Sequence, residues 1–222
     1  LTEVQYMEKM NRTCNIQKLD KDRYADLKTG EIKEFKHSEN RKENYNSLRQ
    51  TFKKLRYLIN NNFFGSGNEL HVVLTYKENI TDPKQLYKDF DTFMKRLKRK
   101  YNIDYINVIE PQGRGAWHCH LLIRFNDLDT VFIANSDLAK MWGHGFVTIK
   151  SLKDVDNIGA YLSAYLTDIE LNENLDKQTI KRTVSEQLEI KEVEGKKFIK
   201  GGRLHMYPSG VNLFRKSRGI KY

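Results

Sequence analysis

The sequence is poor in cysteine and contains no long apolar run. Its two cysteines, Cys14 and Cys119, lie far apart, which excludes a disulfide framework and fits a reducing cytoplasm, where we expect the protein to be located. No apolar run approaches the roughly 18 residues that a membrane span requires, so no membrane partner is expected. The phosphate-cradling pattern Gly-x-x-x-x-Gly-Lys-Ser/Thr is also missing, so an ATP-driven helicase would have to be another protein.

Positive charge is in excess and unevenly distributed. The formal net charge is +10. Residues 41–57 carry six Lys or Arg against one Glu, and residues 195–222 carry eight and no acidic residue. Cations neutralise phosphates and aromatic rings stack on bases, so basic segments interleaved with Tyr, Phe and Trp suit nucleic-acid binding. A generally basic soluble protein would have the same composition.

Hydrophobic periodicity predicts an α+β fold. The first forty residues are polar and are expected to form an arm with limited structure. Strands are predicted over residues 71–76, 103–110, 116–125 and 146–149, and helices over 39–61, 83–100, 135–142, 154–167 and 176–188. This order favours a central antiparallel sheet of the split β-α-β type, RRM-like, with helices on one face. The basic tail is expected to add a strand or to wrap the surface.

We divide the chain into three parts on this basis. Residues 1–68 are expected to form an N-terminal arm and a basic helix, and residues 69–168 the core domain. Residues 169–222 are expected to form a C-terminal helical segment and a basic tail.

A His-x-His pattern within a predicted strand is the strongest chemical signal. Side chains alternate along a strand, so His118 and His120 share a face with Cα atoms about 7 Å apart, while Cys119 points to the other face. Glu110 ends the preceding strand, and a glycine-containing hairpin can bring its carboxylate near the two imidazoles. This mixed set suits Mg²⁺ or Mn²⁺, and zinc is compatible with it. The alternative is a pair of satisfied or surface histidines beside an exposed strand-end charge.

Two tyrosines lie one helical turn apart in the helix predicted over residues 154–167. Tyr161 and Tyr165 are spaced i, i+4 and therefore share a face of that helix. A tyrosine hydroxyl can attack a phosphodiester when a cation withdraws charge from the phosphate. Packing is the alternative reading of such a pair.

Taken together, these motifs resemble those of the HUH endonucleases, especially replication initiators of rolling-circle plasmids and single-stranded phages. Val72-Val73-Leu74-Thr75-Tyr76 resembles the family's first motif, His118-Cys119-His120 the His-hydrophobe-His motif, and Tyr161 with Tyr165 the tyrosine motif. Glu110 has the spacing of the third metal ligand in viral members. The resemblance covers residues 70–168, and residues 201–219 are similar to the end of plasmid-type initiators.

The resemblance implies a metal-dependent nuclease that nicks and rejoins single-stranded origin DNA. Glu110, His118 and His120 would hold the ion, and Tyr161 would attack to form a 5′-phosphotyrosine and free a 3′-OH. Host helicase and replication machinery would act in trans. Many relatives carry Lys three residues after the tyrosine, where this chain has Ala164, so Lys150 or Lys153 is expected to replace that cation. The expected DNA contacts are Arg114, Trp117, Lys150, Lys153, Arg203, Arg215 and Lys216.

Two other functions remain open at this point. A relaxase or transposase would use the same chemistry, although the order of His pair before Tyr favours an initiator or transposase. A non-catalytic, RRM-like nucleic-acid-binding module would need no metal.

Overall fold

The chain divides into two packed units, residues 1–39 and 40–222. The computed structural model describes residues 15–36, 45–112, 115–171, 190–193, 196–199, 202–203, 206–208 and 210–222, with only the backbone described at a few helix and strand positions. The basic helix belongs to the second unit, because it packs on a later helix of that unit. The functional boundaries at residues 68 and 168 stay predictions.

The N-terminal unit contains a small antiparallel sheet where an arm with limited structure was predicted. Strands β1 (Ile16–Lys18), β2 (Arg23–Asp26) and β3 (Ile32–Glu34) pair in sequence order. Short-range hydrogen bonds organise the turns, because the Asp20 carboxylate accepts from the Asp22 and Arg23 amides and Asp26 from the Lys28 amide. Polar residues at these turns obscured the strands, which are only three or four residues long.

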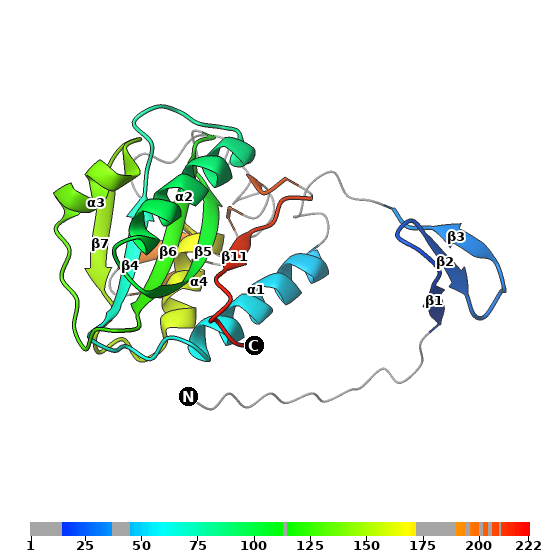
Figure 1. Cartoon of the computed structure of the whole chain (residues 1–222). Helices are drawn as coiled ribbons and strands as arrows, with labels where there is room; N and C mark the ends of the chain where they lie inside the picture. Colours follow the sequence, from blue (N-terminus) through cyan, green and yellow to red (C-terminus); the bar gives the residue numbers. More distant parts are fainter. Residues whose placement is uncertain are drawn as a thin grey trace. The chain divides into compact units, whose positions relative to one another are not determined.

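The second unit is built on a five-stranded antiparallel sheet in the order β11-β5-β6-β4-β7 (Figure 1). The strands are β4 (Glu69–Leu74), β5 (Ile103–Pro111), β6 (Trp117–Phe125), β7 (Val147–Ser151) and β11 (Phe214–Lys216). Helix α2 (Pro83–Lys98) connects β4 to β5, and α3 (Asn135–Trp142) connects β6 to β7. This is the split β-α-β arrangement, so the predicted α+β class is confirmed.

Helices cover both faces of the sheet, whereas one covered face was predicted. Helices α2 and α3 bury Phe90, Phe93 and Leu138 with the face that carries Leu121. Helices α1 (Tyr45–Asn60) and α4 (Ile158–Thr167) bury further side chains with the opposite face, among them Leu55, Ile59, Leu162, Val108 and Leu122. The second face is covered because β5 and β6 are apolar at successive positions and not only at alternate ones.

The ends of α2 and α3 follow from local chemistry. Asp82 caps α2 by accepting a hydrogen bond from the Lys84 amide at 2.9 Å, and Pro83 occupies the first turn. Helix α3 ends at Gly143, whose φ of 78° is the left-handed conformation that glycine adopts most readily.

The C-terminal part of the chain adds short strands. β8 (Ile169–Glu170), β9 (Ile190–Val193) and β10 (Lys196–Ile199) form a small sheet in the order β8-β10-β9. The helix predicted over residues 176–188 lies outside the described residues. In the part of the chain that the structure describes, no helix has the length and apolar character that crossing a membrane requires.

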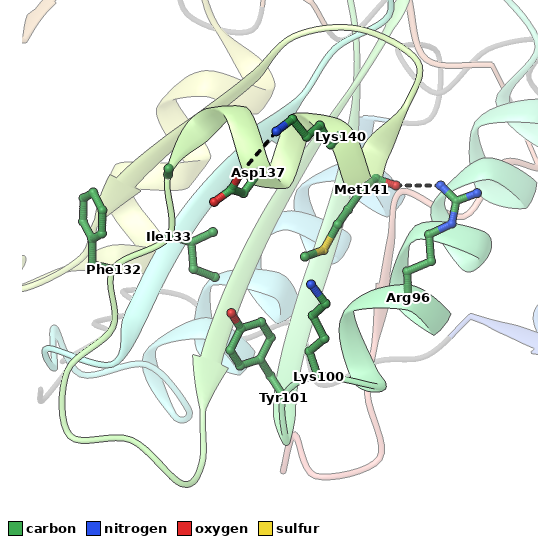
Figure 2. Close-up of a pocket in the computed structure, with 9 residues that line it drawn as sticks. Arg96, Lys100, Tyr101, Phe132, Ile133, Asp137, Lys140 and Met141 are labelled. Atoms are coloured by element: carbon green, nitrogen blue, oxygen red, sulfur yellow. Dashed lines mark hydrogen bonds and ion pairs between the residues drawn. The ribbon is translucent and has the colours of Figure 1, made fainter.

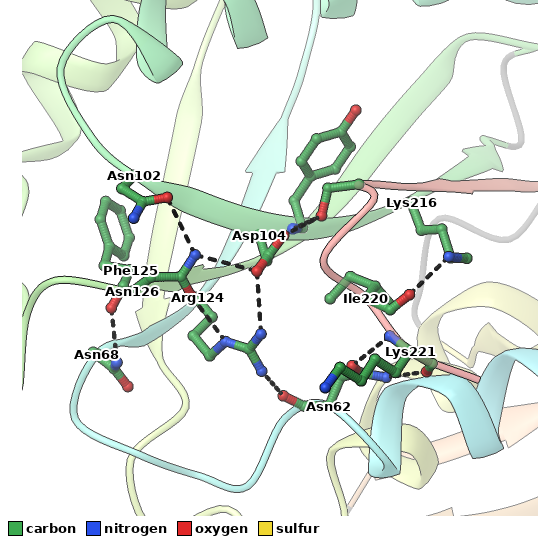
Figure 3. Close-up of polar contacts among 12 residues, drawn as sticks. Asn62, Asn68, Asn102, Asp104, Arg124, Phe125, Asn126, Lys216, Ile220 and Lys221 are labelled. Carbon is green, nitrogen blue, oxygen red and sulfur yellow. Dashed lines mark hydrogen bonds and ion pairs between the residues drawn. The ribbon is translucent and has the colours of Figure 1, made fainter.

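A polar network attaches the end of the chain to the sheet (Figure 3). Ser217 and Arg124 donate to the Asp104 carboxylate at 2.7 and 3.2 Å. The Asn62 side chain donates to the Lys221 carbonyl at 2.7 Å and accepts from its amide at 2.9 Å. Residues 214–216 thus form an edge strand on β5, and the residues after them pack against the end of α1.

Asn62→Ala should lower the free energy of unfolding by about 1–3 kcal/mol, because it leaves buried backbone groups at Leu58 and Lys221 without their partner. Urea unfolding of the full chain measures this. The matched control is Asn61→Ala, since Asn61 is exposed and its amide reaches the Lys221 carbonyl only at 3.5 Å. Equal losses in the two variants would contradict the role of Asn62.

Candidate functional site

The sheet register places the predicted metal ligands on one face. In the β5–β6 pair, Glu110 lies directly opposite His118, and Val108 lies opposite His120. Side chains alternate along both strands, so Glu110, His118 and His120 face the side that α1 and α4 cover. The hairpin therefore brings the carboxylate beside the two histidines.

A chain of polar contacts runs across this face from the C-terminal segment to α4. Arg203 Nη1 lies 2.9 Å from Glu110 Oε1, and the other Glu110 oxygen contacts His120 Nε2. His120 Nδ1 lies 3.1 Å from His71 Nε2. His71 Nδ1 lies 3.1 Å from the Tyr161 hydroxyl. Five side chains from β4, β5, β6, α4 and the C-terminal segment thus form one connected set.

Burial controls the charges of this set. Burial lowers the pKa of His71 well below its ordinary value, and His120 and Lys150 shift it in the same direction, so His71 is neutral at pH 7. Burial alone would raise the pKa of Glu110. The hydrogen bond from His120 and the charges of His120 and Arg203 outweigh it, so the pKa lies below its ordinary value and Glu110 is a carboxylate.

The donor set has the chemistry of a divalent-metal site, but its side chains are paired with one another. Among the described residues, no three His, Cys, Asp or Glu side chains are grouped as metal ligands. Glu110 contacts His120 and Arg203, and His118 Nδ1 lies 3.2 Å from Gln112 Nε2. One carboxylate and two imidazoles on adjacent positions of one sheet face are nevertheless donors that Mg²⁺ or Mn²⁺ accepts.

Cys119 takes no part in this face. It is fully buried on the opposite side, where burial raises the pKa of its thiol to about 12. It therefore remains a neutral thiol and packs as a small apolar residue, as expected from strand alternation.

Close packing between α1 and α4 sets the position of Tyr161. The Asn157 side chain caps α4 by accepting from the Ala160 amide at 3.0 Å. A Cβ atom at Gly159 would lie 2.9 Å from the Arg56 carbonyl oxygen, so only glycine allows this approach. Tyr161 lies two residues further along α4, and its hydroxyl points to His71. Tyr165 lies one turn beyond Tyr161, and its side chain is outside the described part.

The expected DNA contacts lie in different environments. Lys150 is exposed on β7 and pairs in register with His71, and Lys153 is exposed in the loop that follows β7. Arg114 lies outside the described residues. The structure gives the other expected contacts intramolecular partners: Trp117 donates to the Thr81 carbonyl and is 4% exposed, Arg203 contacts Glu110, Arg215 contacts Asp91, and Lys216 contacts the Ile220 carbonyl.

Sequence reasoning missed two residues of this site, His71 and Gln112. His71 was assigned only to a buried strand. The available signal was a histidine inside an otherwise apolar run, because a buried polar side chain requires a partner. Gln112 lies in the hairpin loop, and its contact with His118 depends on the fold of that loop.

Comparisons with known proteins point to DNA replication. Residues 69–170 match a family model described as replication-associated protein ORF2. A curated relative, the phasyl DNA replicon protein arp of Escherichia coli, is 33% identical over 70 residues, which are 31% of this chain and 25% of that protein. The match thus spans a quarter of the relative's length. No solved structure matches.

The matched segment includes β4, β5, β6 and α4, and with them Glu110, His118, His120 and Tyr161. The segment that carries the candidate site is therefore similar to replication-associated proteins, which supports a replication initiator.

Proposed function

We propose that this protein nicks and rejoins single-stranded origin DNA through a 5′-phosphotyrosine, with a divalent metal ion. One observation carries the proposal: the Tyr161 hydroxyl is linked through His71 to His120 and Glu110. A phenol at helical spacing and a His-x-His strand thus meet in one site, and a surface binding module needs no such arrangement.

Glu110, His118 and His120 would hold the ion, which supplies charge withdrawal at the scissile phosphate. Tyr161 Oη attacks phosphorus and forms the new O–P bond. The bond from phosphorus to the 3′ oxygen breaks, and that oxygen gains a proton to balance the one that the phenol loses. The free 3′-OH is then available to a polymerase, and attack by a 3′-OH on the phosphotyrosine rejoins the strand.

Lys150 is the cation that we assign to the place left by Ala164. It lies on the strand next to β4, opposite His71, and its charge contributes to the lowered pKa of His71. An exposed ammonium beside the nucleophile's partner can meet the phosphate backbone of the bound strand. Lys153, in the following loop, extends the same basic edge.

Replication initiation is favoured over conjugation or transposition by the match to replication-associated proteins. Host helicase and replication machinery would be recruited in trans, in the cytoplasm. An RRM-like module without catalysis would leave the buried histidines and Glu110 without a purpose beyond packing.

Tyr161→Phe should reduce covalent protein–DNA adduct by at least about a thousandfold, because the nucleophilic oxygen is lost. The substrates are single-stranded oligonucleotides that tile both strands around the encoding gene, incubated with Mn²⁺ and run on a denaturing gel. Tyr57→Phe, an exposed tyrosine of α1, is the matched control.

Wild-type adduct on none of the oligonucleotides would overturn the nuclease. Adduct that persists in Tyr161→Phe and is lost in Tyr165→Phe would reassign the principal nucleophile to Tyr165.

Removing any one predicted ligand should weaken Mn²⁺ binding to the DNA-free protein by at least about tenfold. Glu110→Gln, His118→Asn and His120→Asn are compared with wild type by isothermal titration calorimetry. The control is His144→Asn, since His144 lies outside the set, near Asp89. Wild-type affinity in all three ligand variants would rule out this metal site.

A further inference from the structure

His71 joins the two halves of the proposed reaction centre. It is 2% exposed, and both of its ring nitrogens are engaged, one with His120 and one with Tyr161. Its ring stacks on His120 at 5.3 Å between centroids with an 18° interplanar angle, and it meets the Tyr161 ring edge-on at 5.5 Å and 90°. His71 therefore bridges the histidine strand and the tyrosine helix.

We propose that His71 is a positioning residue that orients a metal ligand, His120, and the nucleophile, Tyr161, at the same time. The inference rests on the proposed function and deepens it. It assigns to β4 a role that neither the His-x-His strand nor the tyrosine helix can supply.

Hydrogen-bond chemistry determines what His71 does to each neighbour. His120 directs Nε2 toward Glu110 and Nδ1 toward His71, so a ligand bond through Nε2 leaves the Nδ1–H to donate to His71 Nε2. A neutral imidazole that accepts at Nε2 carries its proton on Nδ1. His71 therefore donates to the Tyr161 oxygen, and this hydrogen bond stabilises the oxygen as it loses its proton.

The two contacts can be separated by substitution. In His71→Asn, the amide nitrogen takes the place of Nδ1, so it can donate to Tyr161 but cannot reach His120. In His71→Gln, the longer side chain places its amide oxygen where Nε2 lies, so it can accept from His120. His71→Leu removes both contacts and keeps an apolar side chain.

Two readouts of the full chain test this. We expect His71→Gln to keep Mn²⁺ affinity but to lose about tenfold or more in single-turnover cleavage at saturating Mn²⁺. We expect His71→Asn to lose about tenfold in Mn²⁺ affinity and to recover cleavage at saturating Mn²⁺. His71→Leu should lose both, and thermal unfolding monitors folding in each case.

The inference fails if His71→Leu binds Mn²⁺ and cleaves within about twofold of wild type. It also fails if all three variants lose activity in proportion to their melting temperatures, which is what a packing role predicts. Failure of the proposed function looks different, because then wild type itself neither binds Mn²⁺ nor cleaves.

A separate basic hollow lies on the other face of the sheet (Figure 2). It has a volume of about 690 Å³, within the range of about 300–1,000 Å³ that ligand pockets occupy. The end of α2 contributes Arg96 and Lys100, and α3 contributes Lys140. Phe132, on the segment that leads into α3, lies at the rim and is 91% exposed.

The dipole of α2 accounts for only part of this charge. Basic residues in the last turn of a helix stabilise it, which explains Arg96 without a ligand. Lys140 belongs to another helix, and an almost fully exposed Phe132 stabilises nothing within the protein. A neighbouring hollow of about 460 Å³ shares Lys100 and adds Lys98 and Arg99, so the basic surface continues beyond the first.

We infer that this hollow binds a second stretch of single-stranded DNA, with a base against Phe132 and phosphates on Arg96, Lys100 and Lys140. Cations interleaved with an exposed ring are the pattern of single-strand binding. The hollow is on the opposite face from His118 and near the other end of β6, about 23 Å along the strand at about 3.3 Å per residue. It would therefore hold DNA away from the cut.

Binding of fluorescent dT20 without metal, in a Tyr161→Phe background, tests this without cleavage. Phe132→Ala should raise the Kd about tenfold. Phe146→Ala, at a phenylalanine that is 76% exposed outside the hollow, is the matched control. Lys100→Gln should weaken binding and reduce its salt dependence. Equal affinity of Phe132→Ala and Phe146→Ala would overturn the inference, as would an equal loss for a duplex of the same length.

Discussion

The register between β5 and β6 is the constraint on which the candidate site depends. Nine residue pairs, from Ile103 with Phe125 to Pro111 with Trp117, align the two strands. A slip by one residue would move His118, His120 and the residues between them to the wrong faces, and Glu110 would no longer lie opposite His118. Because both faces of the sheet are packed with apolar side chains, such a slip would also bury polar groups in both cores.

The buried polar set makes a second demand on the fold. Glu110, His120 and His71 are each at most 4% exposed, and a buried polar group is costly without a partner. Each therefore needs the others, and the set is closed by Tyr161 on one side and Arg203 on the other. A proton relay and a divalent site make similar demands on neighbouring donors, which is why this arrangement can serve chemistry as well as packing.

Local signals predicted a large part of the second unit. The helix with Asp82 and Pro83 at its start and the helix that ends at Gly143 both follow from capping residues near the chain positions concerned. The sheet strands were located within a few residues. Two features were missed: the strands β1 to β3, whose residues are mostly polar, and the cover that α1 and α4 provide on the second sheet face. The first lacks periodicity, and the second depends on which helix packs where.

The sequence by itself determined the kinds of donor and their local geometry. His118 and His120 share a face because side chains alternate along a strand, and Tyr161 lies on a helix because of its apolar spacing. Only the tertiary structure decided that His71 lies between them, that Arg203 contacts Glu110 and that Lys150 lies opposite His71. The reason is physical: these pairs are separated by about 50 to 90 residues or more, and their contact depends on the order of strands in the sheet and on how α4 packs over it.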